Sequence, residues 1–223
     1  MTRLAIQPLD LAGRFIFLSA SFPSENRATQ YVEVRPGDVA DAVVAIARGV
    51  LTGHGRLVFG GHPSISPLVL KVAAEYSTRD PSRVTIYQSR LFASLVTEET
   101  LGLEREGYGT IRWTEAVPGD APEQGPEHLA SLEVMRIAML YEVKPVAAFF
   151  VGGVEEGITL EYTLTRGLLP RSPIFCIAGP GGAAAGFSSV GYLPESLVES
   201  LRTSRLYPAV VDASLRFVAE RTG

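Results

Sequence analysis

The chain has 223 residues, of which 46% are hydrophobic, and this apolar content is enough for a single compact domain over residues 1–223. Twenty Lys and Arg against twenty-four Asp and Glu leave a net charge of −4, which excludes the basic surface that a nucleic-acid polymer requires. Cys176 is the single cysteine, which excludes intramolecular disulfides and multi-cysteine zinc sites. No apolar run approaches the ~20 residues that span a bilayer, and no secretion signal is recognisable. We therefore expect a cytoplasmic protein with no membrane partner.

Short apolar runs alternate with amphipathic stretches along the chain. The expected strands cover residues 14–20, 56–59, 83–88, 110–114, 146–151 and 174–178. The expected helices cover residues 36–51, 68–76, 127–143 and 155–166, with two short helices over 194–221. Between 91 and 126, clustered Gly and Pro predict an irregular loop around one short strand. Strands that are apolar almost throughout and alternate with helices predict an α/β fold, a Rossmann-like three-layer sandwich with a mostly parallel central sheet.

Small residues and glycines follow several of the predicted strands. They occupy Ser19–Ser21, Gly60–His62, Gly152–Gly153 and Gly179–Gly182. In a parallel sheet these positions share the carboxyl edge, where ligands bind, and glycine lets a phosphate or ribose approach the backbone. Any parallel α/β protein also needs glycine at some strand-to-helix turns, and for one pair alone that explanation is favoured. Three such turns together favour a nucleotide-binding site at this edge of the sheet.

Other chemistries receive little support from the sequence. Gly179-x-Gly181-x-x-Ala184 matches a dinucleotide-binding pattern, but it lies near the end of the chain without a complete βαβ unit after it. Walker and G-x-S-x-G patterns are absent. His54, His62 and His128 are scattered without a metal-ligand spacing, although His62 stands in a glycine turn where a ligand contact is possible. We predict no metal and no cofactor.

One arginine interrupts the apolar face of the predicted helix 127–143. The helical stripe consists of Leu129, Leu132, Arg136 and Leu140. A guanidinium directed inward requires a carboxylate or phosphate partner.

Two kinds of partner are open for Arg136. A purely structural ion pair would use Glu133 or Glu104. A functional pair would use Glu161, which lies a full turn inside the helix that follows Gly152–Gly153. A carboxylate there would hydrogen-bond a ribose hydroxyl, or stabilise the cationic ribose that develops when an N-glycosidic bond breaks.

These residues resemble the SLOG superfamily, which joins the SMF/DprA proteins and the Lonely Guy (LOG) phosphoribohydrolases. The resemblance is carried, in order, by Ser19-Ala-Ser21, Phe59-Gly60-Gly61-His62, Met135-Arg136 and Val151-Gly152-Gly153-Val-Glu-Glu-Gly157-Ile-Thr-Leu-Glu161. Order and spacing agree with the Lonely Guy pattern over roughly residues 14–166.

The chain also departs from the Lonely Guy pattern. His62 replaces a third glycine, Ile137 a lysine and Val151 a proline, and the second glycine motif is two residues longer. The additional Glu155 and Glu156 bring negative charge toward the phosphate position, so specificity for a nucleoside monophosphate does not carry over. The glycine motifs are more similar to SLOG modules of bacterial defence systems, such as the Thoeris effector's sensor domain for cyclic ADP-ribose signals.

The resemblance implies that the domain binds a nucleotide or NAD-derived small molecule as a sensor or signalling module. The alternative is an N-glycosidase or phosphoribohydrolase in which Arg136 and Glu161 form the catalytic pair. The ligand-binding positions expected are Ser19, Ser21, Gly60, Gly61, His62, Gly152, Gly153, Glu156 and Gly157. By analogy with Lonely Guy dimers, a homo-oligomer is also expected.

Overall fold

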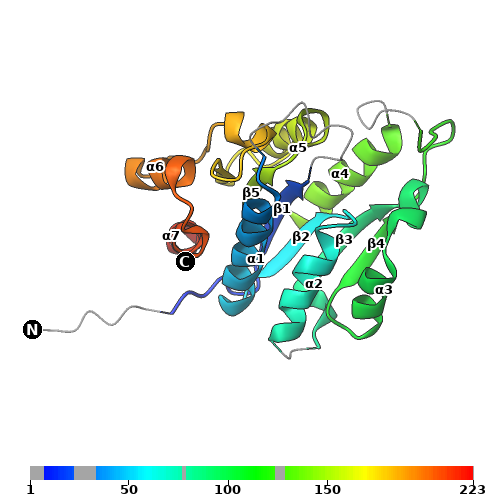
Figure 1. Cartoon of the computed structure of the whole chain (residues 1–223), viewed down its shortest axis with the longest axis horizontal. Coiled ribbons are helices and arrows are strands. Elements are labelled where there is room, and N and C mark those ends of the chain that lie inside the picture. Colours follow the sequence, from blue (N-terminus) through cyan, green and yellow to red (C-terminus); the bar gives the residue numbers. More distant parts are fainter. Residues whose placement is uncertain (1–7, 23–33, 77–78, 124–128, 223) are drawn as a thin grey trace, which may run out of the picture.

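In a computed structural model, the chain is described over residues 8–22, 34–76, 79–123 and 129–222. Six strands form one sheet in the order β4-β3-β2-β1-β5-β6, and all five neighbouring pairs are parallel. The strands are β1 (Phe15–Ser21), β2 (Arg56–Gly60), β3 (Val84–Ser89), β4 (Thr110–Thr114), β5 (Ala147–Gly152) and β6 (Ile174–Ile177). The predicted α/β Rossmann-like sandwich is confirmed (Figure 1).

Helices alternate with these strands along the chain. The α-helices are α1 (Pro36–Thr52), α2 (Ser66–Glu75), α3 (Glu98–Arg105), α4 (Ala130–Val143), α5 (Glu155–Leu168), α6 (Glu195–Thr203) and α7 (Tyr207–Thr222). Short 3₁₀ segments are η2 (Pro81–Arg83), η3 (Arg90–Leu95) and η5 (Ala183–Gly186). None of the helices in the described part of the chain is long and apolar enough to cross a membrane.

Two apolar cores lie on opposite faces of the sheet, because successive side chains of a strand point to opposite sides. In β1, Ile16 and Leu18 belong to the core beneath α1, α2, α6 and α7. Phe17, the residue between them, belongs to the core beneath α4 and α5, where its ring meets that of Phe150 edge to face at 5.9 Å. All of these strand side chains are at most 1% exposed, as expected for a sheet covered on both faces.

The order of the strands places a switch point beside β1. From β1 the chain proceeds outward through β2 and β3 to β4, and it then returns through α4 to β5 on the opposite side of β1. Crevices at the carboxyl ends of strands next to such a reversal are where open α/β sheets bind ligands. The fold therefore directs attention to the ends of β1, β2 and β5.

The segment 91–126, expected to be irregular, contains a further helix, α3. Thr97 caps its first turn by accepting a hydrogen bond from the Thr100 N–H at 3.2 Å, and Glu98 and Glu99 complement the helix dipole there. This helix has only eight residues, and none of its apolar side chains is fully buried, so no long apolar stripe marks it in the sequence. The helix predicted from residue 127 is described from Ala130, and residues 127 and 128 lie outside the described residues.

Candidate functional site

A cavity of about 640 Å³ lies at the carboxyl edge of the sheet. Its wall is formed by residues from the ends of β1, β2 and β3, from α4, from the start of α5 and from the segment that joins β3 to β4. This volume lies within the roughly 300–1,000 Å³ of small-molecule sites. The cavity is therefore the candidate site.

A buried ion pair stands in the wall of this cavity. Arg136 Nε on α4 lies 3.1 Å from Glu161 Oε1 on α5, and the two side chains are 7% and 16% exposed. Ser19, at the end of β1, donates a hydrogen bond from Oγ to Glu161 Oε2 at 2.6 Å. Of the partners that the sequence left open for Arg136, the structure shows Glu161, whereas Glu104 accepts a hydrogen bond from the Ile111 N–H. Three elements distant in sequence thus meet in one cluster.

The guanidinium of Arg136 is incompletely satisfied. Its Nη1 is buried and has no hydrogen-bond partner among the residues that the structure describes. Leaving a buried donor unpaired costs about 1–3 kcal/mol, and more for a charged group, so such atoms call for an explanation. A ligand oxygen is one kind of partner that would satisfy it.

The glycines after β2 lie directly against the cavity. A methyl group added at Gly60 would meet Met135 Cε at 3.4 Å and Glu161 Oε1 at 3.9 Å. A methyl group added at Gly61 would overlap the side chain of Gln88, at 1.8 Å from its Oε1. The Gly61 N–H donates to the Tyr87 carbonyl at 2.7 Å, so this amide belongs to the sheet and is not offered to a phosphate.

His62 also lines the cavity, and it is neutral at physiological pH. Burial lowers the pKa of its imidazole to about 4. Its Nδ1 accepts a hydrogen bond from the Ser64 N–H at 3.2 Å, which assigns the proton to Nε2. At this position His62 offers a neutral donor and not a cation.

The glycines after β5 have a different role. Gly152 and Gly153 adopt φ of +62° and +80°, and neither is among the described residues that line the cavity. The Gly153 N–H donates to the Ser21 carbonyl at 2.9 Å. Its own carbonyl accepts from the Ala183 N–H at 3.1 Å, so this backbone joins the end of β5 to its neighbours. A methyl group added at Gly182 would come within 2.7 Å of the backbone carbon of Gly152.

The remaining predicted positions divide between the cavity and its surroundings. Ser21 and Gly157 line the cavity together with Ser19, Gly60, Gly61, His62, Arg136 and Glu161. A methyl group added at Gly157 would lie 3.7 Å from Arg136 Nη2. The side chain of Glu156 lies outside what the structure describes, so its predicted contact with a ligand stays a prediction.

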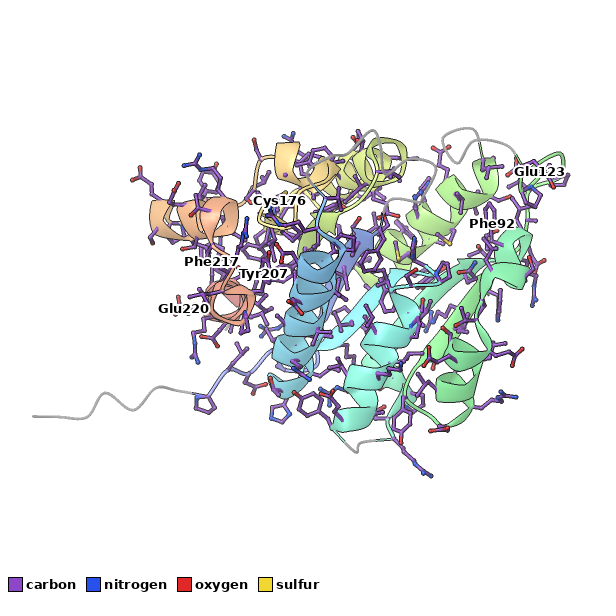
Figure 2. All side chains as sticks on the ribbon, viewed as in Figure 1. Phe92, Glu123, Cys176, Tyr207, Phe217 and Glu220 are labelled. Atoms are coloured by element: carbon purple, nitrogen blue, oxygen red, sulfur yellow. The ribbon has the colours of Figure 1, made fainter. Side chains whose placement is uncertain are left out.

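Sequence reasoning missed the wall that the 86–111 region contributes. Gln88, Phe92, Leu95, Val96, Thr100 and Ile111 line the cavity, together with Ile86. Gln88 is only 6% exposed, and its long amide side chain near the end of a buried strand was the available signal. Figure 2 shows Phe92 beyond the ends of β3 and β4, on the side of the sheet edge away from α5.

The charged side chains in the described lining of the cavity neutralise each other. Among the described residues that line it, the charged side chains are Arg136 and Glu161, which pair with each other. No three His, Cys, Asp or Glu side chains gather as a metal site within the described ranges. A multiply charged phosphate placed deep in this cavity would therefore be desolvated with little compensating charge.

Comparison with protein families identifies the chain. A model described as the SLOG cluster3 family matches residues 31–210, which is most of the sequence. The chain belongs to the SLOG cluster3 family. No curated protein matches it in sequence. Membership of the SLOG cluster3 family indicates a nucleotide-related role.

The SLOG cluster3 match contains most of the cluster described above. Gly60, Gly61, Arg136 and Glu161 all fall within residues 31–210. Ser19, which donates to Glu161, precedes the matched range and joins the cluster through the pairing of β1 with β2 and β5.

Proposed function

We propose that this SLOG domain binds a nucleotide or NAD-derived small molecule of the ADP-ribose type at the carboxyl edge of its sheet, as a sensor or signalling module. The observation that carries the proposal is the Ser19–Glu161–Arg136 cluster, which stands in the wall of a cavity of about 640 Å³. Family membership supports the nucleotide class.

The Glu161 carboxylate suits the hydroxyl groups of a ribose. Each carboxylate oxygen has about two acceptor sites, and Arg136 and Ser19 each take one on different oxygens. The remaining sites accept hydrogen bonds from a pair of adjacent hydroxyls. Because Arg136 and Ser19 already hold the carboxylate in place, little side-chain freedom is lost when the ribose binds.

The first turn of α5 suits the phosphate end of such a ligand. Val154 and Gly157 line the cavity at this turn, and helix N-termini attract anions. The buried Arg136 Nη1 lacks a partner within the described part of the chain, which provides an independent reason to expect a ligand oxygen nearby. The sequence adds two acids, Glu155 and Glu156, at this turn, and their negative charge disfavours a terminal phosphate dianion. A diphosphate bridge carries less charge on each phosphate, which favours an NAD-derived ligand over a nucleoside monophosphate.

A specific observation also favours a second function, hydrolysis of an N-glycosidic bond. Glu161 is a carboxylate on the cavity wall, where it would stabilise a cationic ribose as the bond to the base breaks. In the described lining no other carboxyl group is present, and His62 is a neutral imidazole whose Nδ1 already accepts a hydrogen bond. Because this lining lacks a separate acid to protonate a departing base, binding without turnover remains the leading proposal.

Titration calorimetry and mass spectrometry on the same protein test both functions. The probes are NAD, ADP-ribose, cyclic ADP-ribose and AMP, applied to wild type and Arg136→Ala. The matched control is Arg112→Ala, because Arg112 pairs with Glu142 at 3.5 Å and is not among the described lining residues. We expect an ADP-ribose-type probe to bind wild type and the control, and Arg136→Ala to lose at least tenfold in affinity.

Two outcomes would change this conclusion. Binding that is unchanged in Arg136→Ala, or absent for every probe, overturns the binding proposal. Release of free base by wild type and its loss in Glu161→Gln, with release retained in Glu142→Gln, would establish the glycosidase instead.

A further inference from the structure

The cavity has two chemically different sides. Toward β1 and α5 it presents the hydroxyl and charged groups of Ser19, Arg136 and Glu161. Toward β3 and β4 its described lining is mainly apolar and consists of Ile86, Phe92, Leu95, Val96, Ile111, Pro122, Leu129 and Leu132, with Gln88 and Thr100 as the polar members. The apolar side has no charged side chain in this lining, so it suits an uncharged ring and not a phosphate.

Gln88 is held in a fixed orientation on this apolar side. Its Nε2 donates to the Phe92 carbonyl at 3.2 Å, which also identifies the nitrogen end of the amide, because a carbonyl only accepts. Its Oε1 lies against Gly61, where any side chain would overlap it. No described residue donates a hydrogen bond to Oε1, and the amide retains a second N–H. Gln88 therefore offers an acceptor and a donor side by side.

The positions of the polar groups match the two parts of a nucleoside. Glu161 lies beside Gly60 and Gln88 lies beside Gly61, and these two glycines are consecutive in the chain. A nucleoside lying across the glycines, with its ribose at Glu161, has its base directed toward Gln88. The apolar residues of β3, β4 and η3 then cover the faces of the ring.

We propose that Gln88 and the apolar wall around Phe92 form the base subsite, and that Gln88 selects rings with an adjacent donor and acceptor. Adenine has this chemistry in an uncharged ring, through its amino group and a neighbouring ring nitrogen. This inference rests on the proposed binding function and names the part of the ligand that the site reads. A side chain at Gly61 would displace the Gln88 amide from this position.

A nucleoside pair that differs in one group provides the test. Adenosine is compared with purine riboside, which lacks only the amino group. We expect wild type to bind adenosine about 10- to 100-fold more tightly than purine riboside, since one bidentate contact is worth about 1–3 kcal/mol.

Gln88→Met removes the amide and keeps the length of the side chain. We expect the preference to fall to about 1 in Gln88→Met, while affinity for ribose, which has neither base nor phosphate, is unchanged. The matched control is Arg90→Gln, on the same segment but outside the described lining, which should keep the wild-type preference. If circular dichroism shows that Gln88→Met is unfolded, Phe92→Ala replaces it, with an expected loss of at least tenfold for the nucleosides alone.

The outcomes separate this inference from the proposed function. If Arg136→Ala abolishes binding but Gln88→Met leaves the preference intact, the base subsite is overturned and the binding function stands. The base subsite is also overturned if Gln88→Met weakens the binding of ribose and of nucleosides equally, because that result indicates a structural role. If wild type binds no probe at all, both proposals are overturned.

Discussion

Two glycine pairs follow strands at the same edge of the sheet, yet they are glycines for different reasons. Gly60 and Gly61 keep ordinary backbone angles and border the cavity, where a side chain would approach Glu161 or Gln88. Gly152 and Gly153 adopt left-handed angles, and the amide and carbonyl groups of Gly153 bond to neighbouring backbone. The first pair leaves room for a ligand, and the second pair allows a turn. The same sequence pattern, a glycine pair at the end of a strand, therefore has two physical causes. Substitutions in each pair distinguish the two causes.

The largest effect on stability is expected for Gly152→Ala. A left-handed angle costs an ordinary residue about 1–2 kcal/mol. The added methyl would also lie 2.9 Å from Val39 Cγ2 and 3.1 Å from the Ser21 carbonyl oxygen, which adds overpacking of about 1–3 kcal/mol. We expect the free energy of unfolding in urea to fall by about 3 kcal/mol.

The matched control for that substitution is Gly167→Ala. Gly167 lies in α5, and an added methyl has nothing within 4 Å. Because alanine is the better helix former, a gain of up to about 1 kcal/mol is expected. If both variants change stability equally, the turn at Gly152 is not what requires glycine.

An intermediate effect on stability is expected from a change of pH, because His62, which follows Gly60 and Gly61, titrates differently in the folded and unfolded chain. Burial lowers the pKa of His62 to about 4 from 6.5, so between these values the unfolded chain binds a proton that the folded chain does not. The contribution of neutral His62 to the free energy of unfolding is therefore present in full above pH 6.5, and it is lost as the pH falls toward 4. The ring is partly exposed, so we expect a loss of about 2 kcal/mol from this group.

Replacement of His62 by asparagine isolates that contribution. Asparagine does not titrate, and its carbonyl oxygen retains an acceptor for the Ser64 N–H. Urea unfolding of both proteins at pH 7 and pH 4.5 measures the difference. An equal loss of stability in wild type and His62→Asn would show that His62 is not the responsible group.

The smallest effect on stability is expected for Gly60→Ala. The added methyl would approach Met135 Cε at 3.4 Å, and the backbone angle at Gly60 is not left-handed, so the unfolding free energy should change by less than about 1 kcal/mol. The same methyl enters the cavity beside Glu161, so affinity for ADP-ribose should fall at least tenfold by calorimetry. A large loss of stability with unchanged affinity would instead make Gly60 structural, like Gly152.

Much of the candidate site follows from local sequence patterns. Arg136 stands out because it breaks an apolar helical stripe, and Glu161 because it lies one turn inside the helix after a glycine pair. Their pairing confirms that the two positions are neighbours. Gln88 was missed because the glycine and serine signals at the other strand ends took precedence. Its contact with Gly61 depends on the alignment of β3 with β2, which a single sequence does not encode locally.

By itself, the sequence determined the strands, most of the helices and the α/β class, because hydrophobic period and turn residues are local properties. It also determined that glycines and small residues gather at the carboxyl edge of a parallel sheet. Only the tertiary structure decided which glycines border the cavity, which acid pairs with Arg136, and that the segment with the short helix α3 supplies an apolar wall. These depend on contacts between elements far apart in the chain, where packing and charge neutralisation, and not local pattern, select the partners.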